Sequence, residues 1–240
     1  MGLLKPTWKS KNITKALQAV ENELDQNKLI EIANCAPFLE IREAAVNKIT
    51  HQSGLADVVK NCQEPYNQIK FMAIEKITDQ NILADIAKSD DSWYFREAAV
   101  KKLTDQTTLG YILKNEEHYR VLEIAVEKLN DQSILTDVVE NAENGIVRSL
   151  AVEKITNQAL LVNIAKNDKH SIVRCSAAEK LTDKTLAQDV FSDIAKNDED
   201  WQSRIFAVEK LTDINLLKYV YEHDPVIYVR DAANKKLTDL

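Results

Sequence analysis

One run of eight residues, Ala-Val-Glu-Lys-Leu-Thr-Asp-Gln, recurs with small changes along almost the whole chain of 240 residues. Aligning the copies on their lysine gives spacings of 28, 26, 26, 26, 26, 30 and 26 residues. The aligned lysines are Lys48, Lys76, Lys102, Lys128, Lys154, Lys180, Lys210 and Lys236, and a degenerate ninth copy is centred on Asn22. A fixed period of this length is typical of proteins that stack one small structural unit many times.

Each repeat contains two short helical patterns. In one of them, Val147, Leu150, Ala151 and Ile155 lie at i, i+3, i+4 and i+8, which is one face of a helix. The segment 81–88 shows the same spacing in the helix that follows the shared run. Helices of about ten residues are marginal alone and must bury their apolar faces on neighbours. The sequence therefore predicts an all-α solenoid, a superhelix of about eight to nine short helical hairpins with a 26-residue repeat.

A small residue stands three positions before the aligned position in every copy. It is alanine each time: Ala19, Ala45, Ala73, Ala99, Ala125, Ala151, Ala177, Ala207 and Ala233. A small side chain at the same place in each unit predicts a point where neighbouring helices approach closely.

Two kinds of turn connect the predicted helices. Thr-Asp-Gln, as at residues 78–80, supplies a Thr or Asp that can act as the N-cap of the next helix. The return loop resembles Lys-Asn-Asp, as at residues 196–198, and its Asn is expected in the left-handed C-cap conformation. The longer spacings place extra residues near Pro65 and near Gln188. The four extra residues near Gln188 are close to one helical turn, so the apolar face stays in register.

Composition excludes several other classes of protein. With only 4 Gly and 4 Pro, the chain has no Gly-rich phosphate loop or dinucleotide fingerprint and too few turn residues for an all-β fold. The net charge of −7 makes nucleic acid an unlikely partner. The 3 cysteines are odd in number and never at C-x-x-C spacing, which favours a reducing, cytoplasmic location. No apolar run reaches the ~18 residues of a membrane helix.

The repeat resembles HEAT-like helical repeats. The resemblance is carried by the core Val-Arg-x-x-Ala-Val/Ala-x-Lys-Leu and by the Asp of the turn, although the unit is shorter than a typical HEAT unit. The runs 91–96 (Asp-Ser-Trp-Tyr-Phe-Arg) and 200–204 (Asp-Trp-Gln-Ser-Arg) also resemble the leucine-rich variant repeat. The resemblance implies an armadillo-like superhelix. It would be one domain over residues 1–240, with an N-terminal cap at 1–18 and repeats at 19–240.

A basic residue stands six positions before the aligned lysine in all but one of the eight regular copies. The series is Arg42, Lys70, Arg96, Arg148, Arg174, Arg204 and Arg230, and Leu122 interrupts it, with Arg120 two residues earlier. One interpretation is a basic stripe that binds phosphate or an anionic peptide. The other is structural, with the arginines paired to the turn acids Asp79, Asp105, Asp131, Asp183 and Asp213.

Aromatic residues gather just before that basic position, at the start of the same helix. They are Trp93, Tyr94, Tyr119, Trp201 and Tyr228. Aromatic side chains beside arginines are typical of protein-binding hot spots, but each ring could instead cover its own hairpin. The richest stretch predicts an anchor patch of Trp93, Tyr94, Arg96, Tyr119 and Arg120, with Arg148, Arg174, Trp201 and Arg204 as further binding residues.

The sequence gives no catalytic or metal-binding constellation. It has no G-x-S-x-G and no H-E-x-x-H, and its histidines His51, His118, His170 and His223 are scattered. Cys175 lies on a predicted helix with no evident base beside it. We therefore expect no metal and no cofactor, and the sequence favours a non-enzymatic protein.

The leading functional prediction is a scaffold that binds a protein or peptide on the surface lined by the second helix of each repeat. Two alternatives follow from the resemblance: a DNA-binding repair protein like the HEAT-like alkylpurine DNA glycosylases, and a bilin-lyase-like protein. At the ends, Trp8 is expected to cover the first hairpin. Leu237 and Leu240 follow the last repeat directly without a polar cap, which predicts weak end-to-end self-association.

Overall fold

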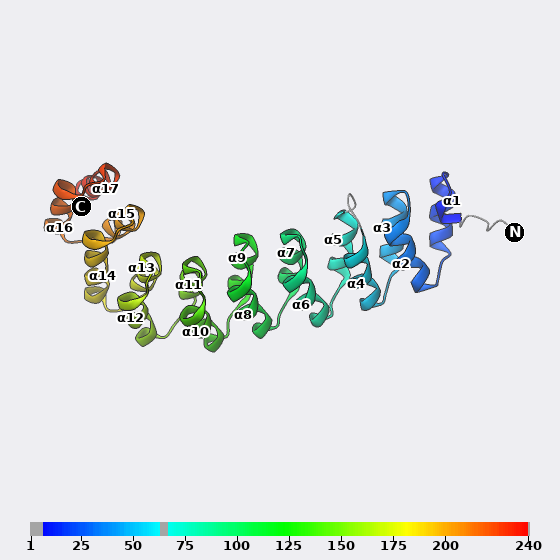
Figure 1. The fold of residues 1–240 in the computed structure, drawn as a ribbon, viewed down its shortest axis with the longest axis horizontal. Coiled ribbons are helices and arrows are strands. Elements are labelled where there is room, and N and C mark those ends of the chain that lie inside the picture. Colours follow the sequence, from blue (N-terminus) through cyan, green and yellow to red (C-terminus); the bar gives the residue numbers. More distant parts are fainter. Residues whose placement is uncertain (1–6, 63–66, 240) are drawn as a thin grey trace. The chain divides into compact units, whose positions relative to one another are not determined.

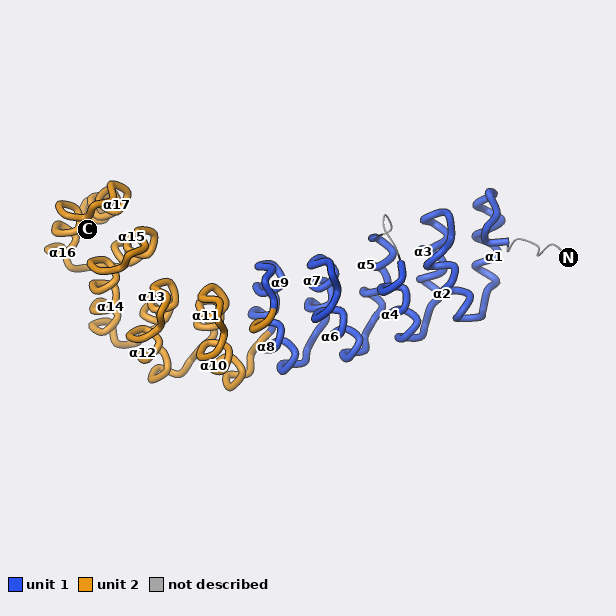
Figure 2. The backbone as a smooth tube through the Cα atoms, in the orientation of Figure 1, with its two compact units in different colours: residues 1–112, 116–128 blue, residues 113–115, 129–240 orange. Residues whose placement is uncertain are grey.

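The computed structural model describes residues 7–62 and 67–239. Contacts divide the chain into two compact units (Figure 2). Unit 1 contains residues 1–112 and 116–128, and unit 2 contains residues 113–115 and 129–240. The expected single domain over 1–240 stays a prediction. Pro65, near which the first insertion was expected, lies outside the described residues.

Unit 1 consists of short helices joined by tight turns. They are η1 (Thr7–Lys9), α1 (Ile13–Glu21), α2 (Gln26–Cys35), α3 (Leu39–Lys48), α4 (Gln52–Asn61), α5 (Asn67–Lys76), α6 (Gln80–Ser89), α7 (Trp93–Lys102) and α9 (Tyr119–Lys128), together with most of α8 (Gln106–Asn115). Trp8 is buried, and η1 packs on α1, as expected for a covered first hairpin.

Unit 2 repeats the same plan. Its helices are α10 (Gln132–Asn141), α11 (Gly145–Val152), α12 (Gln158–Asn167), α13 (Ser171–Glu179), α14 (Lys184–Asn197), α15 (Trp201–Lys210), α16 (Ile214–His223) and α17 (Ile227–Asp239). The described part of the chain is helical without strands, which confirms the all-α prediction. Nowhere in that part is a helix both long and apolar enough to pass through a bilayer.

Successive helices pair as hairpins, and hairpins stack. We call the even-numbered helices α2 to α16 the A helices, and the odd-numbered helices α1 to α17 the B helices. Within each unit the B helices form one row and the A helices the other (Figure 1). Thus α3 packs on α2 of its own hairpin and on α1 and α5, and α13 packs on α12, α11 and α15. The apolar stripe of each helix is buried in these contacts, because neither helix would persist alone.

The two residues at the centre of each B helix pack toward opposite neighbours. The alanines three positions before the aligned lysine are fully buried in the eight regular repeats, which supports close helix approach. In α1, which only η1 precedes, Ala19 is partly exposed while Val20 is buried. In α17 the pattern inverts, since Ala233 is buried and Asn234 is exposed. The alanine therefore faces the preceding repeat, and the residue after it faces the following one.

Every A helix except α4 begins at an acidic or amide N-cap, as the Thr-Asp-Gln turn predicts, whereas α4 begins at His51, whose side chain makes no cap hydrogen bond. The Asp79 carboxylate, for example, accepts the backbone N–H groups of Asn81 and Ile82. The expected left-handed C-cap is wrong. The residues that follow the A helices have negative φ, as at Asp198 with φ −71° and ψ 137°, and Asn197 remains helical. The Asn197 side chain instead donates to Asp193 one turn earlier.

The glutamine of the turn binds the next turn along the stack. The Gln80 Oε1 atom accepts the Thr104 backbone N–H at 2.8 Å and its hydroxyl at 3.1 Å, and the Gln80 Nε2 atom donates to the Lys102 carbonyl at 3.3 Å. Gln26, Gln52, Gln132, Gln158 and Gln188 make the same set of contacts. A buried or half-buried backbone carbonyl needs such a partner, so the glutamines satisfy groups that a turn would otherwise leave open.

The aligned lysine reaches back to the preceding B helix. The Lys76 ammonium donates to the Asn47 carbonyl at 2.6 Å, and Lys128 donates to the Lys101 carbonyl at 2.7 Å. Lys48, Lys102 and Lys180 bind the equivalent carbonyls. A cation at a helix C-terminus satisfies the last carbonyls and interacts favourably with the helix dipole. The aligned lysine therefore caps the C-terminus of the preceding B helix.

Candidate functional site

The arginines six positions before the aligned lysine are held between two repeats. The Arg148 Nη1 atom donates to the carbonyls of Ala142 at 2.7 Å and Glu143 at 2.9 Å, where the A helix of its own hairpin ends. Its Nε and Nη2 atoms donate to the two carboxylate oxygens of Asp168, each at 2.8 Å. The side chains of Arg148 and Asp168 are only 4% and 11% exposed. All of these contacts lie within the fold, so the Arg148 guanidinium is not presented to a ligand.

In unit 2 these contacts join into one continuous ladder. Each acid receives one arginine on its carboxylate and the next arginine on its backbone carbonyl. The chain of contacts runs through Arg148, Asp168, Arg174, Asp198, Arg204, Asp224 and Arg230. In unit 1, Arg96 pairs with Glu116 at 2.6 and 2.8 Å in the same manner.

The ladder is structural, but the expected acidic partners are wrong. Its acids are the residues that follow the A helices, namely Glu116, Asp168, Asp198 and Asp224. The turn acids Asp79, Asp105, Asp131, Asp183 and Asp213 cap helix N-termini instead. Leu122, which interrupts the series, is a buried apolar residue with 1% exposure.

The ladder also sets the ionisation of its acids. Burial raises the pKa of the Asp168 carboxyl, but the hydrogen bonds from Arg148 and from the His170 backbone N–H outweigh it, and the pKa falls below its ordinary value. Burial also raises the pKa of the Glu116 carboxyl, but the hydrogen bonds from Arg96 and from the His118 backbone N–H outweigh it. The pKa of Glu116 is therefore lowered as well. Both acids are therefore charged at neutral pH and neutralise the arginines beside them.

The predicted anchor patch in unit 1 divides into supporting and exposed residues. The half-buried Trp93 ring stacks on Tyr94, with ring centroids 3.7 Å apart, and on His118, with centroids 3.8 Å apart and planes 11° apart. Tyr94 and Tyr119 are 54% and 50% exposed. The sequence did not predict His118 as a member of this cluster. The signal for it was its position directly before a B helix.

The two arginines of the patch differ. Arg96 belongs to the ladder, where hydrogen bonding to Glu116 raises its pKa further. The Arg120 side chain is 64% exposed and lies 3.7 Å from Glu123 on its own helix. The residues that unit 1 presents to solvent at this edge are therefore Tyr94, Tyr119 and Arg120.

Unit 2 presents apolar side chains at the same edge of its B helices. We call Ile146, Ile172, Trp201 and Tyr228 the unit 2 strip, with exposures of 53%, 39%, 39% and 63%. The Trp201 and Tyr228 rings are in contact, with centroids 5.6 Å apart. Of the residues predicted here, Arg148, Arg174 and Arg204 belong to the ladder, and only Trp201 is exposed.

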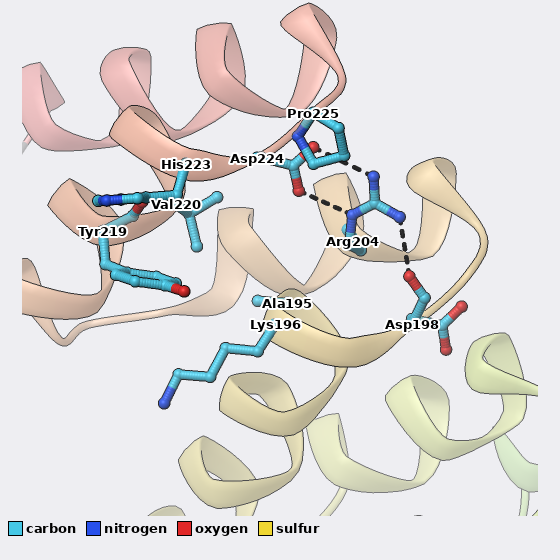
Figure 3. Close-up of a pocket in the computed structure, with 9 residues that line it drawn as sticks. All are labelled: Ala195, Lys196, Asp198, Arg204, Tyr219, Val220, His223, Asp224 and Pro225. Atoms are coloured by element: carbon cyan, nitrogen blue, oxygen red, sulfur yellow. Dashed lines mark hydrogen bonds and ion pairs between the residues drawn. The ribbon is translucent and has the colours of Figure 1, made fainter.

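A pocket of about 270 Å³ lies over the last rungs of the ladder (Figure 3). Arg204 is within it, bound to both carboxylate oxygens of Asp224 and to the Asp198 carbonyl. Tyr219 and His223 stack on its other side, with ring centroids 4.5 Å apart. Because the guanidinium already has an acid and two carbonyls, the pocket does not offer its charge to an anionic ligand.

The two buried cysteines are poor nucleophiles. Burial raises the pKa of the Cys175 thiol to about 12, so it is protonated and not nucleophilic at neutral pH. Burial also raises the pKa of Cys62, and Cys35 is the exposed cysteine. Across residues 7–62 and 67–239, His, Cys, Asp and Glu side chains form no group of three that could hold a metal ion.

No family model matches this chain, and no curated protein matches its sequence. Among solved structures, one similar chain comes from work described as "Computational Design of Self-Assembling Cyclic Protein Homooligomers". It is 12% identical over 93% of this chain and 86% of that chain, with a TM-score of 0.14. A TM-score this low supports no conclusion about fold or function. The structure itself defines the class, a helical repeat protein, and membership of the HEAT-like repeats stays a prediction.

Proposed function

We propose that this protein is a non-enzymatic scaffold that binds peptide or protein segments along the N-terminal edge of its B helices. The observation that carries the proposal is how the chain divides its large side chains. The ladder arginines are engaged internally, whereas each B helix from α7 to α17 exposes a large aromatic or aliphatic residue eight or nine positions before its aligned lysine. Exposed aromatic residues beside an arginine, such as Tyr94, Tyr119 and Arg120, are the residue types that anchor protein partners.

The edge is also well prepared for binding. Trp93 is held between Tyr94 and His118, and Trp201 rests on Tyr228, so these rings lose little freedom when a partner arrives. Preorganised side chains bind more tightly because the cost of ordering them has already been met in folding.

The DNA-repair alternative loses its main support. It relied on the arginine stripe, and the arginines of the stripe from Arg96 onward hold acids or helix ends of the fold. Phosphate groups would have to displace these partners in a chain of net charge −7. The bilin-lyase-like alternative rests on the predicted resemblance alone, and the side chains described here do not favour it.

The test begins with a random peptide library selected on the purified full-length chain. Bound peptides should slow hydrogen exchange of backbone amides at the starts of α7 and α9 or of the B helices in unit 2. A Tyr94→Ser/Arg120→Ser variant should lose the peptides that protect α7 and α9, whereas a Tyr111→Ser/Lys114→Ser variant on α8 should keep them. Protection confined to the A helices, or equal binding by both variants, would refute the proposed surface.

A further inference from the structure

Helix α14 is one turn longer than every other A helix of the described chain. It has 14 residues where the others have 10. The additional residues, 184–187, stand between the Asp183 and Gln188 of its Thr-Asp-Gln turn. Gln188 still makes the regular contacts with the Lys210 carbonyl and the Thr212 N–H, both at 2.9 Å. The insertion therefore adds one turn at the start of α14, as the spacing predicted.

The insertion changes how α15 sits against α13. Arg174 reaches Asp198 with one nitrogen only, Nη2 at 3.0 Å, whereas Arg148 and Arg204 each bind their acid with two. Lys210 pairs with the Glu179 carboxylate, whereas Lys48, Lys76, Lys102, Lys128 and Lys180 bind a backbone carbonyl. Both differences fall at the junction that follows the insertion, and we infer from them that the insertion shifts the two B helices relative to each other there.

A groove of about 530 Å³ opens where the shift occurs. It lies between the loops that precede α13 and α15, and its lining contains four acidic and two basic side chains. Asp198 is bound by Arg174, and Asp200 caps α15. Asp193 and Glu199 are exposed, and their charge faces the groove with no arginine of the ladder against them.

Apolar side chains continue from the groove along the unit 2 strip. Ile172 lines the groove and is 39% exposed, and Trp201 follows Asp200 directly at the start of the next B helix. A row of exposed apolar side chains favours an interaction site, and the acidic groove beside it determines the sign of the charge that fits.

We propose that the groove between α13 and α15, together with the unit 2 strip, binds a peptide segment in which Lys or Arg lies next to apolar side chains. The cation enters the groove near Glu199 and Asp193, and the apolar side chains cover Ile172 and Trp201. This inference rests on the proposed function and names the chemistry of the partner. Buried apolar contact supplies affinity, and the acidic groove rejects acidic segments and polyanions.

The test measures binding of three labelled probe peptides to the full-length chain by fluorescence anisotropy. The first contains leucine and lysine spaced by serine, the second has glutamate in place of lysine, and the third has serine in place of leucine. We expect the first peptide to bind at least about tenfold more tightly than the other two, with affinity falling as salt rises. Equal binding of the lysine and glutamate peptides would overturn the inference.

Matched variants locate the site. Asp193→Asn/Glu199→Gln should weaken binding of the leucine–lysine peptide by about tenfold, while Glu140→Gln/Glu222→Gln, with the same change in net charge, should not. Ile172→Ser should weaken binding, and Ile214→Ser on the outer face of α16 should not. If each variant binds as its control does, the site is wrong even though the proposed scaffold function can still hold, because the library selection tests that function separately.

Deleting residues 184–187 tests the origin of the groove. The deletion restores Thr-Asp-Gln at 182, 183 and 188 and the regular spacing of 26, so the chain is expected to fold. A circular dichroism spectrum and urea midpoint close to those of the parent chain would verify this. The folded deletion variant should bind the leucine–lysine peptide about as weakly as Asp193→Asn/Glu199→Gln does. Unchanged binding by a folded variant would show that the insertion does not create the site.

Discussion

At the scale of single residues, cations take the place of glycine at helix ends. A helix commonly ends with glycine in a left-handed conformation that satisfies its last carbonyls. Here an arginine binds the ends of α2, α6, α10, α12, α14 and α16, as Arg204 does at Asp198, and in five repeats a lysine binds the end of the preceding B helix, as Lys76 does at Asn47. This explains how a chain with so many turns contains only 4 glycines.

The ladder predicts a large difference between two arginines. Arg148→Ala should lower the free energy of unfolding by about 3–5 kcal/mol, because it leaves the Asp168 carboxylate buried without its partner. Arg120→Ala should change it by no more than about 0.5 kcal/mol, because Arg120 is an exposed residue with one weak ion pair. Urea unfolding followed by circular dichroism measures both. Similar losses for the two variants would contradict the structural role of the ladder.

The lowered pKa values of Glu116 and Asp168 predict loss of stability in acid. The ordinary values are 4.5 and 3.8, so the stabilisation is full above them and is lost as pH falls through the lower values of the folded chain. The urea midpoint should therefore drop as the pH falls below about 4.5. Asp168→Asn should be less stable at neutral pH and less sensitive to acid, and the exposed Glu140→Gln should follow the parent chain. Parallel curves for all three would refute the assignment.

At the scale of helices, the alanine of each B helix sets the distance to the preceding repeat. Ala99→Leu should destabilise the chain by about 1–3 kcal/mol, because Ala99 is fully buried in α7, which packs on α5. The same change at Ala19, which is partly exposed in α1, should cost much less. Urea midpoints compare the two. Equal losses would show that the close approach does not occur at this position.

Most of the helix arrangement could be predicted from sequence, and the part that could not was missed for a physical reason. The period places the helices, the turns and the buried alanines, because each depends on local pattern. The partners of the arginines were missed because acids recur at several positions of every repeat, and local pattern does not say which one lies across the interface. The missed signal was a fixed separation of 20 residues, shared by Arg96 and Glu116, Arg148 and Asp168, and Arg204 and Asp224.

One departure from that separation supports the same interpretation. Twenty residues after Leu122, the acid is replaced by Ala142, so the basic and the acidic member of the pair are lost together. In the predicted anchor patch, Tyr94, Tyr119 and Arg120 are exposed and their binding role stays a prediction, whereas the inward role of Arg96 was missed. Exposure depends on which partner a long side chain finds, and that partner is distant in sequence.

At the scale of the whole molecule, the last hairpin has a distinctive outer face. Asn234 stands where the other B helices have a buried aliphatic residue, and Tyr221, 44% exposed, stands where the other A helices have a buried Ala, Val or Leu. Asn234 contributes an amide and Tyr221 a hydroxyl at positions that are wholly apolar in the other repeats, and such polar groups on an outer face favour solubility. Leu237 is partly buried, and Leu240 lies outside the described residues. End-to-end association stays a prediction, and these two replacements should limit its strength.

This predicts that restoring the repeat pattern makes the end adhesive. Tyr221→Val/Asn234→Val should self-associate at lower protein concentration than the parent chain, because the change removes the tyrosine hydroxyl and the asparagine amide from that face. Sedimentation velocity over a range of concentrations measures the shift. Gln18→Val/Asn163→Val, placed on other exposed surfaces, provides the control for added hydrophobicity. Equal behaviour of the two double variants would show that this face is not special.

The contacts that join one repeat to the next consist largely of side chains bound to backbone groups. The glutamine and arginine contacts are the same in hairpins whose B helix begins with Trp93, with Gly145 or with Trp201, so they do not depend on the residues of the outer first turn. The residues that hold the stack together are therefore different from those that we propose to bind a partner. A protein engineer could rewrite the outer turn of one hairpin at a time and obtain a new specificity without redesigning the stack.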